Sequence, residues 1–63
     1  MNLRELGVYI GNVAKDYPQL KDQVWDIFCL AHEEILDGES EFHECELAYE
    51  EINELIEEEK NNE

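Results

Sequence analysis

The sequence predicts an all-α fold, a small three-helix bundle with helices at about residues 2–15, 18–37 and 41–59. Three observations carry this prediction. Apolar residues recur at three- and four-residue steps in each segment, the pattern of amphipathic helices. Asp16-Tyr17-Pro18 and Asp37-Gly38-Glu39-Ser40 interrupt the pattern with turn-forming residues. The chain of 63 residues is long enough for one domain only, so we assign residues 1–63 to a single helical domain.

The small size raises the question of how the core is completed. A domain of this length sits near the lower limit at which one hydrophobic core suffices, so either the helices are well formed or a homodimer shares the core. Hydrophobic residues make up 43% of the chain, which excludes a wholly disordered protein despite the net charge of -14.

The first segment has one apolar stripe, because its large apolar residues fall on one side at 100° per residue. Gly7-Val8-Tyr9-Ile10-Gly11 is the ambiguous part, since its middle residues favour a strand and glycine weakens helices. Gly7 and Gly11 are four residues apart, a spacing that predicts close packing, against another helix of the chain or against a partner helix. The stripe consists of Leu3, Leu6, Ile10, Val13 and Tyr17.

The second segment is predicted to be the central helix. Pro18 fits a first helical turn, Asp16 is placed to cap it, and Gly38 is a natural left-handed stop. More than half of the helical circumference is apolar or aromatic, so this helix should touch two neighbours or a second copy of the chain. Trp25 and Leu30 lie at the margins of this surface and are the candidate oligomer contacts. The apolar surface comprises Leu20, Val24, Trp25, Ile27, Phe28, Cys29, Ala31, His32, Ile35 and Leu36.

The third segment is amphipathic. Ser40 is a good N-cap, and Glu41 is well placed near the positive end of the helix dipole. We expect the apolar arc to dock on the second helix. That arc consists of Phe42, Cys45, Ala48, Tyr49, Ile52, Leu55 and Ile56, and glutamates occupy the opposite arc.

A short motif occurs twice, as LAHEEI at residues 30–35 and as LAYEEI at residues 47–52. In both copies the alanine and the isoleucine fall on the buried stripe, whereas the leucine points away from it, among acidic residues. Because the flanking sequences differ, one helical solution used twice is favoured over a duplicated unit. Leu30 and Leu47 are then either ordinary exposed leucines or the apolar points of two contact surfaces.

Charge is distributed unevenly along the chain. Residues 1–31 carry four acids and three bases, a balance of -1, whereas residues 32–63 carry fourteen acids and one base, a balance of -13. A polyanionic half argues against direct binding of nucleic acid and of anionic membrane surfaces, since both recruit clustered lysine and arginine. No apolar run approaches a membrane span and no secretory-signal pattern is present, so we expect a cytoplasmic protein.

Four residues have side chains that zinc accepts: Cys29, His32, His43 and Cys45. His43 and Cys45 argue against a zinc site, because residues two apart on a helix point about 200° from each other and cannot converge on one ion. The alternating acids of the DGESE stretch are similar to a calcium loop but have Phe42 where a glycine is needed. We therefore predict no metal and no cofactor. Catalytic residues are not predicted either, since no oxyanion donors accompany the cysteines and a bundle of this size leaves little room for a cleft.

The glutamates of the third helix conflict with local helix stability. Glu50 and Glu54, and likewise Glu54 and Glu58, are like charges four residues apart, each pair costing about 0.2–0.5 kcal/mol. The nine glutamates from Glu41 to Glu59 extend over about 27 Å of helix, roughly 3 Å per charge. One DNA strand spaces its phosphates at about 3.4 Å. A solvated face is one interpretation, and recognition of a basic partner is the other. The predicted partner-binding residues are Glu44, Leu47, Glu50, Glu51, Glu54 and Glu58.

The stretch DGESEFHECELAYEEI, Asp37 to Ile52, resembles segments of short acidic helical proteins of unknown role that bacteriophages encode. The resemblance implies no functional residue, but such proteins include inhibitors of host enzymes and nucleic-acid mimics. The function we expect is a non-enzymatic acidic binding protein, an inhibitor or modulator that occupies a basic site on a partner, such as a nucleic-acid-binding host protein. The alternative is a structural or oligomerising helical subunit, for example a homodimer.

Overall fold

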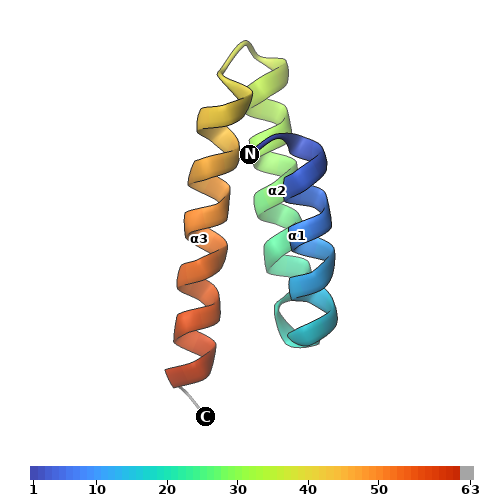
Figure 1. The fold of residues 1–63 in the computed structure, drawn as a ribbon, viewed down its shortest axis with the longest axis vertical. Coiled ribbons are helices and arrows are strands. Elements are labelled where there is room, and N and C mark those ends of the chain that lie inside the picture. Colours follow the sequence, from blue (N-terminus) through green and yellow to red (C-terminus); the bar gives the residue numbers. More distant parts are fainter. Residues whose placement is uncertain (62–63) are drawn as a thin grey trace.

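In a computed structural model, which describes residues 1–61, the chain forms a three-helix bundle (Figure 1). The α-helices are α1 (Leu3–Asp16), α2 (Lys21–Leu36) and α3 (Glu41–Asn61), with a 3-10 turn η1 (Pro18–Leu20) before α2. α1 and α3 run in the same direction, and α2 runs antiparallel to both. The described residues contain no strand, so the predicted all-α fold is confirmed.

α1 begins with a capping box. The Asn2 side chain accepts a hydrogen bond from the Glu5 amide at 2.8 Å, and the Glu5 carboxylate accepts one from the Asn2 amide at 3.2 Å. These bonds satisfy amides that have no partner within the helix. Residues 7–11 are helical, which decides against a strand there.

The turn from α1 to α2 relies on proline rather than on a side-chain cap. The Tyr17 amide donates to the Val13 carbonyl at 2.7 Å, and Pro18 then opens η1. The prediction that Asp16 caps this start is wrong, because Asp16 is the last residue of α1 and no side chain caps η1. The preset φ of proline starts the turn, and Leu20 is buried at its end.

The turn from α2 to α3 has the predicted residues in their predicted roles. Gly38 has a φ of 107°, in the left-handed region that glycine tolerates best. Its amide donates to the Ile35 carbonyl at 3.0 Å. Ser40 Oγ accepts a hydrogen bond from the His43 amide at 3.3 Å, as an N-cap does.

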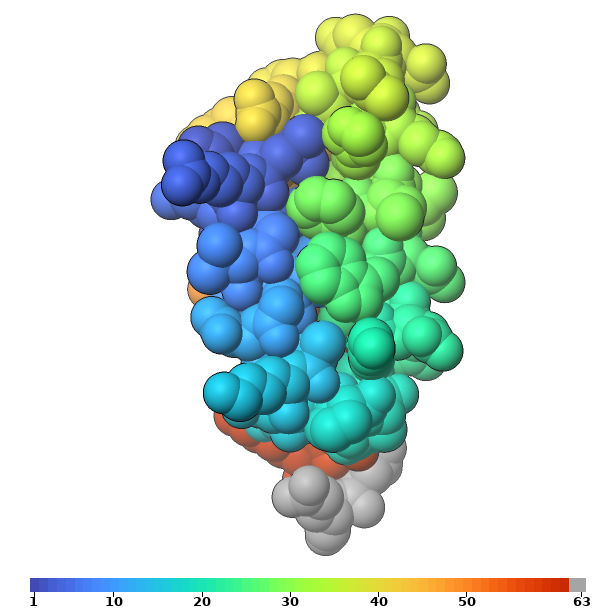
Figure 2. All heavy atoms as spheres, turned by 90° about the vertical axis from the view of Figure 1, so that its right-hand side faces the viewer, coloured from blue at the N-terminus to red at the C-terminus, as the bar shows by residue number. Residues whose placement is uncertain are grey.

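α2 is the central element, as predicted, because it packs against both α1 and α3. Figure 2 shows the face on which α1 and α2 pack side by side, with most of α3 behind them. Three elements contribute to the core, so each depends on the others for burial. The fully buried side chains are Leu6, Ile10, Val24, Cys45 and Ile52.

The two glycines of α1 do not mediate close packing against another described helix of the chain. A Cβ added at Gly7 would meet the Phe28 ring at 3.6 Å, an ordinary van der Waals distance, and one added at Gly11 would meet nothing within 4 Å. Within the described bundle Gly11 therefore has no packing role, and the space beside Gly7 would admit a Cβ; packing of these glycines against a partner helix stays a prediction.

Leu36 and Phe42 were expected on apolar arcs but are 73% and 65% exposed. Phe42 lies on the same side of α3 as Tyr49, which packs against Tyr9 of α1 with ring centroids 4.8 Å apart and ring planes tilted by 45°. The Leu3 amide donates to the Glu41 carboxylate at 2.9 Å, so α1 begins beside the first residue of α3, and Phe42 lies at this end of the bundle. The end of the α2–α3 hairpin projects beyond the start of α1 (Figure 1), and Leu36 and Phe42, on either side of the turn, are exposed there.

Exchanging glycine for alanine at two positions should shift stability in opposite directions. Gly11→Ala should stabilise the fold by roughly 1 kcal/mol, because the site is helical and open. Gly38→Ala should destabilise it by about 1 kcal/mol or more, because alanine is strained at positive φ. Urea unfolding followed by circular dichroism measures both. Equal effects of the same sign would contradict this assignment of the α2–α3 turn.

Candidate binding groove between α2 and α3

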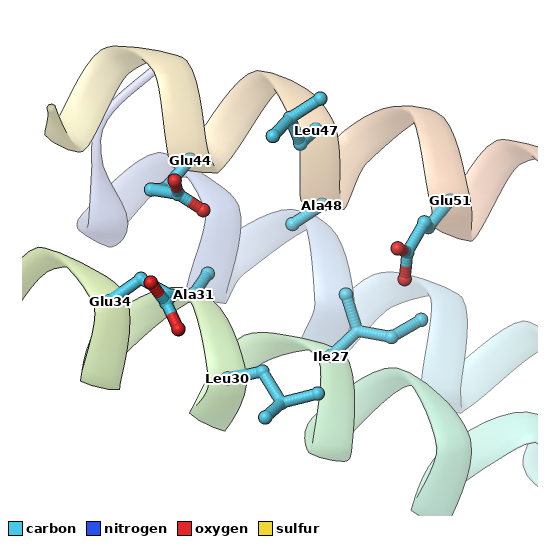
Figure 3. A pocket seen from close by; sticks show the side chains of 8 residues that line it. All are labelled: Ile27, Leu30, Ala31, Glu34, Glu44, Leu47, Ala48 and Glu51. Carbon is cyan, nitrogen blue, oxygen red and sulfur yellow. The ribbon is translucent and has the colours of Figure 1, made fainter. Parts of the chain in front are cut away.

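Leu30 and Leu47, the leucines of the two motif copies, line one groove between α2 and α3 (Figure 3). In the close-up, α1 lies behind the two helices, so the groove opens on the face that α1 does not cover. Leu30 is 61% exposed and Leu47 is 45% exposed. The sequence placed each leucine beside acids, and the structure brings both to one site. The lining residues are Ile27, Leu30, Ala31, Glu34, Glu44, Leu47, Ala48 and Glu51.

The two helices contribute matching positions to the groove. Each motif copy supplies its leucine, its alanine and its second glutamate, together with the residue three positions before the leucine. These four positions fall within an arc of about 100° on a helix. Because α2 and α3 are antiparallel, the two arcs face the groove in approximate two-fold symmetry. The symmetry is broken at one place, where Ile27 corresponds to Glu44.

The hollow exists because small residues meet where the helices touch. Ala31 and Ala48 are buried at 6% and 4% exposure and form its floor, while the two leucines rise on either side. The groove has a volume of about 120 Å³, below the roughly 300 Å³ at which small-molecule sites begin. It has the size of a recess for a side chain of another molecule.

The rim of the groove is acidic. Its charged residues are Glu34, Glu44 and Glu51, and its lining includes no lysine or arginine. Glu34 and Glu44 lie at one end and Glu51 at the other (Figure 3). Like charges on neighbouring helices repel, so a cation bound at either end would relieve an unfavourable interaction.

Other glutamates of α3 bond within the molecule. Glu41 accepts from the Leu3 amide at 2.9 Å, Glu59 accepts from Gln19 Nε2 at 2.6 Å, and Glu46 pairs with the amino group of Met1 at 3.5 Å. These contacts attach both ends of α3 to the rest of the bundle. None of the three residues is among those predicted to bind a partner.

The predicted partner-binding residues divide into three locations. Glu44, Leu47 and Glu51 line the groove, and Glu50 and Glu54 are exposed on α3 outside it. Glu58 lies beside a second hollow of about 350 Å³ near the end of α3. That hollow is lined by Gln19, Leu20, Gln23, Leu55, Glu58 and Glu59, and two of these residues, Gln19 and Glu59, bond to each other.

The predicted oligomer contacts, Trp25 and Leu30, do not share a surface. Trp25 is half-buried and packs edge-on against Phe28, with ring centroids 5.5 Å apart, and Phe28 in turn faces Gly7 of α1. Five residues along a helix turn through about 140° beyond one full circle. Trp25 therefore belongs to the α1 side of α2, and Leu30 belongs to the groove.

The cysteines and histidines of the zinc alternative are also separated. Cys29 is exposed and Cys45 is fully buried, both thiols are free, and His32 stacks on Phe28. Within residues 1–61, no three histidine, cysteine or acidic side chains are grouped to hold a metal ion.

Comparisons with protein-family models, with curated proteins and with solved structures were made for the whole chain. None of them found a match. Among the described helices, none has both the length and the apolar character needed to cross a bilayer.

Sequence reasoning missed four lining residues: Ile27, Ala31, Glu34 and Ala48. The repeated motif pointed to this groove. When two antiparallel helices pack through the equivalent alanine of each copy, the leucine beside each alanine lies along the same seam. The motif does not predict the register between the two helices, because the register depends on how they pack.

The two thiols should differ strongly in reactivity. Burial raises the pKa of the Cys45 thiol, and Glu41, Glu46 and Glu44 raise it further against the opposing effect of the N-terminal amine. At pH 8 an alkylating reagent should modify Cys29 at once and Cys45 at least about 100-fold more slowly, through opening of the bundle. Mass spectrometry of timed samples measures this, with Cys29→Ser as the single-thiol control. Equal rates without denaturant would contradict the burial of Cys45.

Proposed function

We propose that this protein is a non-enzymatic acidic binding protein that occupies a basic site on a partner protein. The observation that carries the proposal is the division of the glutamates. Glu41, Glu46 and Glu59 bond within the bundle, whereas Glu50 and Glu54 project from α3 beside the exposed Leu47. A surface of free carboxylates around one apolar contact suits a basic protein surface with an apolar centre.

The charge density of α3 supports competition with nucleic acid. Its nine glutamates average roughly 3 Å of helix axis per charge, close to the phosphate spacing of one DNA strand at about 3.4 Å. A partner that binds nucleic acid through a basic groove is therefore a suitable target, and association would be fast and sensitive to salt. An inhibitor or modulator would act by occupying the basic groove of the partner.

A non-enzymatic role is supported by the composition of the groove between α2 and α3. Its lining consists of aliphatic residues and three glutamates, without a histidine, cysteine or serine that would act as a base or nucleophile. The groove is also too small to enclose most substrates.

Reversing charge on α3 should strongly weaken partner binding. We expect affinity purification from the host cell to recover a basic partner, with an affinity that falls at least about tenfold between 50 and 200 mM salt. Leu47→Glu should weaken the complex about tenfold, and combined Glu50→Lys, Glu51→Lys and Glu54→Lys about 100-fold or more. Val8→Glu, at another exposed apolar position, is the control. A complex indifferent to salt and to the charge reversal would refute electrostatic recognition.

The second candidate is an oligomerising structural subunit, favoured by the exposure of Leu36 and Phe42 on either side of the α2–α3 turn. Charge opposes it, since two copies bring together net charges of -14 each. Sedimentation at micromolar concentration should therefore give a monomer of 7.5 kDa. A stable dimer that Leu36→Gln and Phe42→Gln together dissociate would favour the structural role instead.

A further inference from the structure

We infer that the groove between α2 and α3 receives one cationic amphipathic helix of the partner protein. In this arrangement one aliphatic side chain of the partner inserts between Leu30 and Leu47, and its lysines or arginines reach the carboxylates at the two ends. The inference rests on the proposed function and makes it specific, because it names the element recognised and extends the binding surface from the outer face of α3 to the seam between α2 and α3.

The apolar part of the site suits a single side chain. The hollow of about 120 Å³ equals the liquid volume of about four water molecules. Its floor is formed by two buried alanines and its walls by two exposed leucines, so an aliphatic group placed there removes apolar surface of both molecules from water.

The length of the groove favours a helix. The lining of α2 runs from Ile27 to Glu34, about 10 Å or two helical turns. A helix laid along the seam would contact α2 and α3 together, with apolar residues three or four positions apart toward the floor and cations one turn away on either side.

Charge selects a cationic occupant. Among the described residues, no hydrogen bond or ion pair engages the carboxylate of Glu34 or of Glu44, and no basic residue lines the groove. A second copy of this chain would bring a net charge of -14 toward these carboxylates, and a nucleic acid would bring phosphates, so repulsion opposes both.

The broken symmetry of the groove gives the occupant a direction. One end has two carboxylates, Glu34 and Glu44, whereas the other has Glu51 with the aliphatic Ile27. The partner helix should therefore place two basic residues at the first end, and one basic with one apolar residue at the second.

The test uses two peptides and matched variants of the full chain. The first peptide has 15 residues, with leucines on one helical face and flanking lysines, and the second is a scrambled form of the same composition. We expect the amphipathic peptide to bind at least tenfold more tightly in a fluorescence titration at low salt. Glu34→Gln with Glu51→Gln should weaken it at least tenfold, whereas Glu33→Gln with Glu57→Gln, an equal charge change outside the groove, should weaken it less than twofold.

A second comparison tests the apolar contact. Leu30→Gln with Leu47→Gln should weaken the amphipathic peptide at least tenfold, and Val8→Gln should leave it unchanged. All of these side chains are exposed, and circular dichroism verifies that the variants fold. Equal binding of both peptides with equal loss in both glutamate pairs would overturn the groove site while leaving acidic recognition standing. If neither peptide binds, the groove site is also overturned. The proposed function is then tested independently by the affinity purification from the host cell.

Discussion

The packing of α2 against both α1 and α3 is the interaction on which the rest of the structure depends. The chain is too short to build a core from two helices, so its central helix must be apolar over more than half of its surface. Leu6 and Ile10 from α1, Val24 from α2, and Cys45 and Ile52 from α3 are all fully buried in the resulting cluster. α1 covers only one face of the α2–α3 pair. The line of contact between α2 and α3 therefore remains open on the opposite face, where it forms the groove.

The acidic residues fall into two groups, those that bond to other parts of the bundle and those that do not. Some hold the bundle together through neutral amides and the N-terminal amine, which suits a chain with four basic side chains. Others have no bond to another described residue, and Glu50, Glu54 and Glu58 follow one another at four-residue spacings that cost helix stability. A domain of this size has little stability to spare, so unfavourable charges that contribute nothing to packing are an argument for the binding role that we propose.

Much of the architecture could be predicted from sequence because the signals are local. Helical periodicity, the left-handed Gly38 and the cap by Ser40 act over a few residues and appear in the structure as expected. The expectations that were wrong concern contacts between segments. Phe42 has the periodicity of a buried residue but is exposed at the end of the bundle where α1 begins, and Gly11 has the spacing of a packing glycine but faces open space. Periodicity predicts the direction in which a side chain points, whereas burial requires that another helix lie opposite it at the same level of the bundle.

The sequence by itself determined that each copy of the repeated motif directs its alanine inward and leaves its leucine among glutamates, since this follows from 3.6 residues per turn. Only the tertiary structure decided that Leu30 and Leu47 belong to one site. That outcome depends on the register between antiparallel helices, which the length of the Gly38 turn and the packing of Ala31 and Ala48 set together. The same packing separated Trp25 from Leu30, because α1 occupies one side of α2 and leaves the other side to the groove.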